Sequence, residues 1–166
     1  GLAESERRPG SAAACRRLLL WPGCCAIHGH LRPESVQAAR AAYPGCRVLA
    51  HPECRPELIG LCDGSGSTSY LIKEAEKAAG EGGTLIIGTE TNLVHRLRDR
   101  FAGRCRIEPL APAICPDMAK VTEENLLACL QGVAAGTAPI MTLQDEQLAP
   151  ARASLTRMLQ VCAAQR

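Results

Sequence analysis

Short apolar segments alternate with helical patterns along most of this chain, and that alternation constrains its fold more than any other feature. The sequence predicts strands at residues 18–21, 48–50, 84–88 and 105–110. Helices are predicted around them, at 33–43, 56–62, 67–79 and 92–101. The segment 84–88 is apolar throughout, as expected of a strand that is buried on both faces of a sheet. This order predicts an α/β fold, a three-layer αβα arrangement around a mostly parallel sheet.

Both ends of the chain depart from this alternation. Residues 1–16 are polar and contain Pro, Gly and Ser without an apolar period, which predicts a disordered lead. An αβα region is then expected over residues 17–115. The remainder, 116–166, is expected to form a carboxy-terminal helical segment that packs on the αβα core, with Thr122 as the cap of its first helix.

Composition and charge exclude several classes of partner. The net charge is +2 and the chain has only four aromatic residues, so a nucleic acid would find neither a basic surface nor stacking platforms. No apolar run approaches the roughly 20 residues that a membrane helix requires, and the run at 18–21 is too short for a signal peptide. We therefore expect no nucleic-acid partner, no membrane association and a cytoplasmic location.

Ten cysteines lie within the helix and strand patterns rather than at loop-rich spacings. That placement fits reduced thiols in an intracellular protein. The sequence contains no CxxC pair, which argues against a zinc ribbon or a thioredoxin-type redox site because both need two sulfurs within one turn.

Polar side chains follow several of the predicted strands. Ligands meet the carboxyl ends of the strands in an open parallel sheet, so these side chains are expected to share one rim. The residues concerned are Cys25, His51, Glu53, Thr89, Glu90 and Cys115.

Cys25 and His28 form a C-x-x-H motif directly after a Pro-Gly turn. A lone cysteine is more often a core residue than a ligand, so spacing alone leaves both interpretations open. Thiolates from separate strand ends can converge on one metal cluster, and Cys25 and Cys115 are the pair placed to do so.

Two further motifs combine polar groups with the start of a helix. His51 and Glu53 can serve as an acid/base pair, or as a backbone-bonded histidine and the acidic first turn of the next helix. Ser67 and Thr68 follow Gly66 at a helix start, which suits binding of an anion, although N-capping by Ser67 explains the same pattern.

Five motifs occur in a fixed order: W-P-G-x-C-x-x-H, H-P-E-C, G-S-T-S, G-T-E and C-P-x-M. In this order and near these intervals they resemble quinolinate synthase, from about Leu18 to the end of the chain. The resemblance covers the later half of a family member, which is built from three similar αβα domains around a pseudo-threefold axis. The first domain and part of the second are therefore expected to be missing.

The resemblance implies a 4Fe-4S cluster with one iron open to substrate. Cys25 and Cys115 match two of the three cluster cysteines, and the third has no matching motif in this chain. His28, His51 and Glu53 match catalytic positions, while Ser67 and Thr68 match substrate-binding positions.

The implied reaction is the condensation of iminoaspartate with dihydroxyacetone phosphate to quinolinate, phosphate and water, a transferase step toward NAD. The implied partners are these two small molecules, the missing first domain and an oxidase that produces iminoaspartate. Because two thiolates hold a cluster less well than three, the chain alone is expected to bind the cluster poorly and to turn over little substrate.

Two other interpretations stay open from the sequence. The chain can be a catalytically incompetent αβα fragment or paralogue. Less favoured is a zinc-binding structural module, for which Cys25, His28, His51 and Cys54 offer ligands of the right type.

Overall fold

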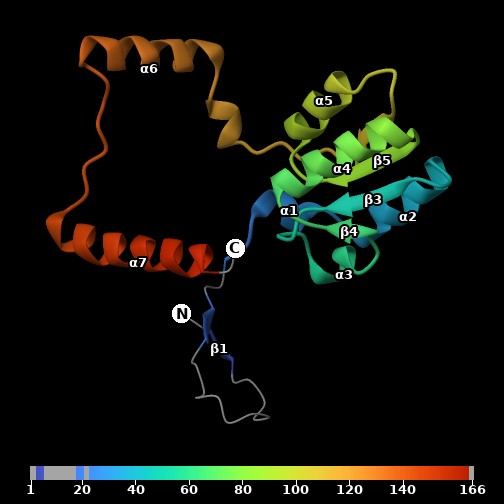
Figure 1. The fold of residues 1–166 in the computed structure, drawn as a ribbon, viewed down its shortest axis with the longest axis horizontal. Coiled ribbons are helices and arrows are strands. Elements are labelled where there is room, and N and C mark those ends of the chain that lie inside the picture. The colour runs from blue at the N-terminus through green and yellow to red at the C-terminus, as the bar shows by residue number, and fades with distance from the viewer. Residues whose placement is uncertain (1–2, 6–17, 21–22, 165–166) are drawn as a thin grey trace. The chain divides into compact units, whose positions relative to one another are not determined.

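The computed structural model describes residues 3–5, 18–20 and 23–164 (Figure 1). The chain divides into two compact units, Gly1–Lys120 and Val121–Arg166. The predicted lead at 1–16 lies outside the described residues except for Ala3–Ser5, so its disorder stays a prediction.

A four-stranded parallel sheet forms the centre of the first unit. Its strands are β3 (Arg47–Ala50), β4 (Gly64–Ser65), β5 (Thr84–Gly88) and β6 (Arg106–Pro109), in the spatial order β4-β3-β5-β6. All three neighbouring pairs are parallel. The predicted parallel sheet is therefore confirmed, and all four strands present their carboxyl ends at the same edge.

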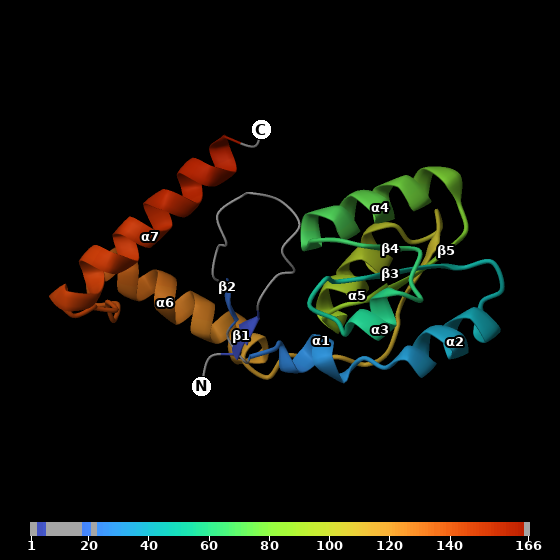
Figure 2. The ribbon, with the colours of Figure 1, turned by 90° about the horizontal axis from the view of Figure 1, so that it is seen from below.

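Helices cover both faces of this sheet, which confirms the three-layer αβα fold (Figures 1 and 2). Helices α2 (Pro33–Ala42) and α3 (Pro56–Ile59) contribute to the hydrophobic cluster on one face. Helices α4 (Thr68–Glu81) and α5 (Thr91–Arg100) contribute to the cluster on the other.

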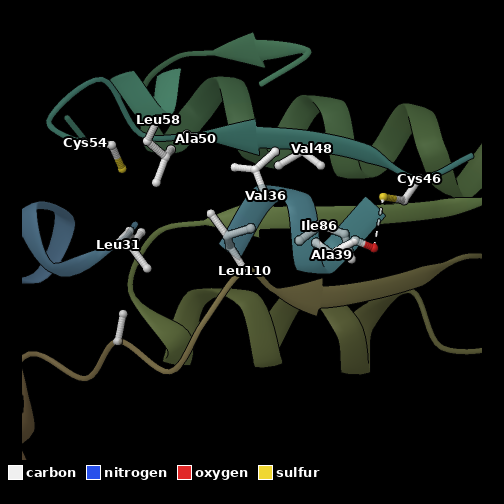
Figure 3. Close-up of a cluster of buried hydrophobic side chains, with 11 residues drawn as sticks. Leu31, Val36, Ala39, Cys46, Val48, Ala50, Cys54, Leu58, Ile86 and Leu110 are labelled. Carbon is white, nitrogen blue, oxygen red and sulfur yellow. Dashed lines mark hydrogen bonds between the residues drawn. The ribbon is translucent and has the colours of Figure 1, made fainter. Parts of the chain in front are cut away.

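Side chains alternate between the two clusters along the central strands β3 and β5, as the period of a β-strand requires. Val48 and Ala50 of β3 belong to the cluster drawn in Figure 3, where they lie among side chains of α2, α3 and β5. Leu49, between them, belongs to the opposite cluster. Strand β5 divides in the same way, which explains why its sequence is apolar throughout.

Three local elements differ from the sequence-based expectation. Leu18–Leu20 forms strand β2, but it pairs antiparallel with β1 (Ala3–Ser5) in a separate two-stranded sheet. The edge of the parallel sheet is instead taken by the two-residue strand β4. A five-residue helix, α1 (Ala26–His30), follows Cys25, so this cysteine stands at the N-cap position of a helix and does not end a strand of the parallel sheet.

The second unit consists of α6 (Glu123–Ala135) and α7 (Asp145–Ala163). Thr122 caps α6 as predicted, because its hydroxyl accepts the Asn125 N–H at 3.2 Å. None of the described side chains on these two helices is buried. Packing of this unit on the αβα core stays a prediction. Among the described residues, every helix is too short or too polar to cross a membrane.

Asp63 closes the β3–β4 edge of the sheet. Its carboxylate accepts the Val48 N–H at 2.7 Å, and its own N–H donates to the Val48 carbonyl at 2.8 Å. Arg40 donates to the same carboxylate at 3.1 Å. Burial alone would raise the pKa of Asp63, but the Val48 N–H and the Arg40 guanidinium together lower it. Asp63 therefore extends a strand pair that has only two residues in β4.

We expect Asp63→Ala to lower the free energy of unfolding by roughly 1–3 kcal/mol, because it leaves the Val48 N–H without its acceptor at a buried position. Asp63→Asn keeps an acceptor oxygen and should cost less. Urea denaturation of the three proteins measures the difference. An Ala variant as stable as the unmodified chain would contradict this role of Asp63.

Candidate functional site

A buried histidine links three segments that are distant in the sequence. His28 on α1 is 8% exposed. Its Nδ1 lies 3.0 Å from Glu53 Oε2, and its Nε2 lies 3.1 Å from Thr89 Oγ1. A carboxylate only accepts, so the Nδ1–H of His28 donates to Glu53, and Nε2 is hydrogen-bonded to the Thr89 hydroxyl. The His28 ring is thus held in position at both nitrogens.

His51 stacks on this ring. The two imidazole centroids are 4.4 Å apart and the ring planes differ by 12°. His51 Nδ1 accepts the Glu53 backbone N–H at 3.4 Å and lies 3.6 Å from Glu53 Oε2. The sequence-predicted residues His28, His51 and Glu53 therefore meet at one place in the structure.

The surroundings of His51 favour its neutral form. Burial lowers the pKa of His51 below the usual 6.5, and the neighbouring His28 lowers it further, while Glu53 opposes the shift. Because Nδ1 accepts a hydrogen bond, the ring proton of the neutral form is on Nε2. A neutral imidazole of this kind can accept or relay a proton near neutral pH.

The turn after β5 holds the site together. At Gly88, the carbonyl accepts the His51 N–H at 2.9 Å. Thr89 then bonds His28, and Glu90 caps α5 by accepting the Asn92 N–H at 2.8 Å. Thr89, Glu90 and Thr91 are all buried. Sequence reasoning placed this turn at the rim but assigned none of its residues to the site, since capping explained the motif almost as well.

The same turn anchors the segment that carries Cys115. Thr91 donates its N–H to the Ala113 carbonyl at 2.8 Å, and its hydroxyl accepts the Ala113 N–H at 2.8 Å. Cys115 follows two residues later and is partly exposed. The backbone beyond β6 is therefore tied to the carboxyl end of β5, two residues from the threonine that bonds His28.

Cys25 precedes His28 by three residues and is also partly exposed. Its sulfur, a ring nitrogen of His28 and a carboxylate oxygen of Glu53 all lie within 4.8 Å of one another. The Arg55 guanidinium donates to the Gly29 carbonyl at 3.0 Å and so fastens α1 to the segment that carries His51 and Glu53. This arginine was not singled out from the sequence.

Ser67 and Thr68 lie at the start of α4, after β4. Both are exposed. The Ser67 hydroxyl accepts the Tyr70 N–H at 3.3 Å, so the capping interpretation of this serine is correct. These hydroxyls lie along the same carboxyl edge of the sheet, but β4 is two places from β5. Among the described contacts, neither hydroxyl forms a hydrogen bond to the His28 group.

The Cys54 thiol is buried and bonded to the backbone. It is 4% exposed, and its S–H donates to the Gly88 carbonyl at 3.6 Å. Burial raises the pKa of Cys54 to about 11, with a further contribution from Cys62, so the thiol stays protonated. This disfavours the zinc module in which Cys54 is a ligand.

We expect His51 to make stability depend on pH. Because its native pKa lies below 6.5, the unfolded chain binds more protons than the native chain between the two values, so stability rises with pH there. The free energy of unfolding should therefore decrease as pH falls below about 6.5. Denaturation measured from about pH 7 down to pH 5 should show a shallower decrease for His51→Asn.

His30→Asn serves as the control, because His30 is an exposed histidine two residues after His28. It should keep the decrease seen in the unmodified protein. An unchanged decrease in His51→Asn would contradict the assigned neutral state of His51.

Comparisons with known proteins identify the family of the chain. A family model described as quinolinate synthetase A protein matches residues 10–160. Quinolinate synthase of Methanoregula boonei is 38% identical over 145 residues, which cover 87% of this chain and 46% of that protein. Quinolinate synthase of Streptomyces coelicolor is 38% identical over 163 residues, covering 96% and 40%. This chain spans less than half of the length of these relatives, and it belongs to the quinolinate synthase family.

Proposed function

We propose that the chain carries the later part of a quinolinate synthase active site, which condenses iminoaspartate with dihydroxyacetone phosphate to quinolinate, phosphate and water. The observation that carries this proposal is the buried His28, held between Glu53 and Thr89 with His51 stacked against it. Such an arrangement fixes acid/base groups in position, and it lies at the sheet edge where ligands meet an α/β fold.

The chain's own residues have distinct parts in this proposal. His51, neutral because of its burial, accepts a proton from bound substrate and returns it in a later step. Glu53 orients the His28 ring through the contact at Nδ1. Ser67 and Thr68 offer exposed hydroxyls at the start of the 14-residue helix α4, where a phosphate or carboxylate of substrate is favoured by the helix dipole.

Cys25 and Cys115 are the proposed ligands of the 4Fe-4S cluster. Both thiols are partly exposed. The segment of Cys25 is bonded to the turn at 89–91 because His28 contacts Thr89, and the segment of Cys115 is bonded to the same turn because Ala113 contacts Thr91. This placement fits a group shared between them. When bound, the cluster would supply an open iron that polarises substrate oxygens.

The cytoplasm is a reducing compartment and suits these cysteine thiols. The nine cysteines in the described part of the chain are free thiols, as cluster ligation requires. An oxidase that produces iminoaspartate is the proposed supplier of substrate, and the first domain of a family member is the proposed supplier of the third cysteine.

Anaerobic cluster reconstitution followed by iron and sulfide analysis tests this proposal. With two ligands, the chain alone should bind well below four irons and form little quinolinate. Addition of a separately produced first half of the Methanoregula boonei relative should raise both values toward about four irons and measurable turnover.

Cys25→Ser and Cys115→Ser should each abolish the gain, whereas Cys162→Ser, at an exposed thiol of α7, should not. About four irons and turnover from the chain alone would overturn the requirement for a third cysteine. A complemented chain that binds cluster but forms no quinolinate would favour the catalytically incompetent alternative.

A further inference from the structure

We propose that the amino edge of the parallel sheet carries a docking surface for an acidic segment of a partner protein. The surface consists of residues 95–106, the end of α5 and the turn that leads into β6, and is called the arginine edge below. The candidate site gathers at the carboxyl ends of the strands, so the arginine edge lies at the opposite end of the sheet. Figure 3 shows the two ends, with Cys46 just before β3 at one and Cys54 at the other.

Positive charge is concentrated in this short segment. Residues 95–106 contain five arginines and one acidic residue, a net charge of +4, whereas the rest of the chain has 14 basic and 16 acidic residues, a net charge of −2. The charge of the whole chain, +2, conceals this difference. A basic surface of this kind attracts and orients acidic groups before contact. All five arginines are exposed: Arg96, Arg98, Arg100, Arg104 and Arg106.

Arg104 is held in place by an aromatic ring. Its guanidinium lies 5.0 Å from the centre of the Phe101 ring, and Phe101 is 2% exposed. The Arg100 guanidinium lies 5.1 Å from the same centre, so one ring holds two cations close together. Arg100 is paired with Glu76 at 3.1 Å, whereas Arg104 has no carboxylate partner among the described residues. The charge of Arg104 is therefore left for a ligand from outside the chain.

Arg106 repeats this arrangement on a second ring. Its guanidinium lies 5.5 Å from the centre of the Tyr43 ring, and Tyr43 packs on the opposite face of the sheet from Phe101. In the described part of the chain, neither the Arg104 nor the Arg106 guanidinium forms an ion pair or a hydrogen bond. Stacking uses the flat face of a guanidinium and leaves its N–H donors free to bind a carboxylate in a bidentate pair.

The dipole of α5 explains only part of this charge. Cations are favoured in the last turn of a helix, which accounts for Arg98 and Arg100. Arg104 and Arg106 lie beyond the end of the helix, after Gly103, whose φ of 76° turns the chain toward β6. Two cations without a carboxylate partner add repulsion beside three others, and an acidic partner relieves that repulsion.

The surroundings favour carboxylates of a protein over a nucleic-acid strand. A strand is bound by a continuous positive track and by aromatic faces on which bases stack. Both rings of this region are covered by guanidinium groups, and Glu76 of α4 interrupts the track at Arg100. The segment contains arginine and no lysine, the preference that protein–protein interfaces show.

Binding of a fluorescein-labelled octaglutamate peptide to the full chain tests the proposal, with fluorescence anisotropy as the measurement at low and at physiological salt. Arg104→Gln combined with Arg106→Gln should weaken binding by about 10-fold and make its salt dependence shallower. Arg104→Lys combined with Arg106→Lys keeps both charges but loses the planar fork, so binding should weaken by about 3-fold.

A matched control removes the same charge elsewhere. Arg152→Gln combined with Arg157→Gln changes two exposed arginines of α7, and this variant should bind the peptide as the unmodified chain does. Far-ultraviolet circular dichroism checks that each variant is folded. Equal weakening in the α7 control would overturn the proposal, because binding would then follow net charge alone.

A single-stranded oligonucleotide of the same charge as the peptide distinguishes the two classes of partner. Tighter binding of the oligonucleotide than of the peptide would overturn the proposal in favour of a nucleic-acid partner, and absence of peptide binding at low salt would overturn it outright. None of these measurements depends on turnover or on a metal, so a failure of the proposed function is seen separately.

Discussion

The site depends on one buried imidazole that is bonded at both nitrogens. His28 reaches Glu53 through Nδ1 and Thr89 through Nε2, across sequence separations of 25 and 61 residues. A buried ring of this kind is costly unless both polar atoms are satisfied, and once satisfied it has a single orientation. Glu53 then reaches His51, and Thr91 reaches Ala113, so the remaining groups take their places from this ring and from the turn beside it.

The αβα core makes this arrangement possible. Strand β5 lies inside the sheet and is buried on both faces, so the turn that follows it is held at a rigid edge. Parallel pairing brings the segments after β3, β5 and β6 to that same edge. The sheet therefore provides the frame, and the polar turn at 89–91 selects which side chains meet on it.

Much of the sheet and part of the site were predictable from local patterns. The features that were missed have physical reasons. The strands β3, β5 and β6 have clear apolar runs, and the rule that ligands meet carboxyl strand ends placed His51 and Glu53 correctly. Helix α1 was missed because five residues give no helical period. Strand β4 was missed because two residues show no alternation and are defined only by pairing with β3. Thr89 was undervalued because its partner is 61 residues away, which no local pattern reveals. The convergence of Cys25 and Cys115 stays a prediction, supported by the contacts of Thr89 and Thr91.

Cross-linking of the two cysteines tests the central claim most directly, that the turn at 89–91 gathers both thiol-bearing segments at one edge of the sheet. A short bifunctional thiol reagent would be applied to the folded, reduced Cys24→Ser chain, and the linked peptides would be mapped by mass spectrometry. The account predicts a cross-link between Cys25 and Cys115 that is lost on unfolding in urea. Single modification of each thiol, with cross-links formed only to other cysteines, would contradict it.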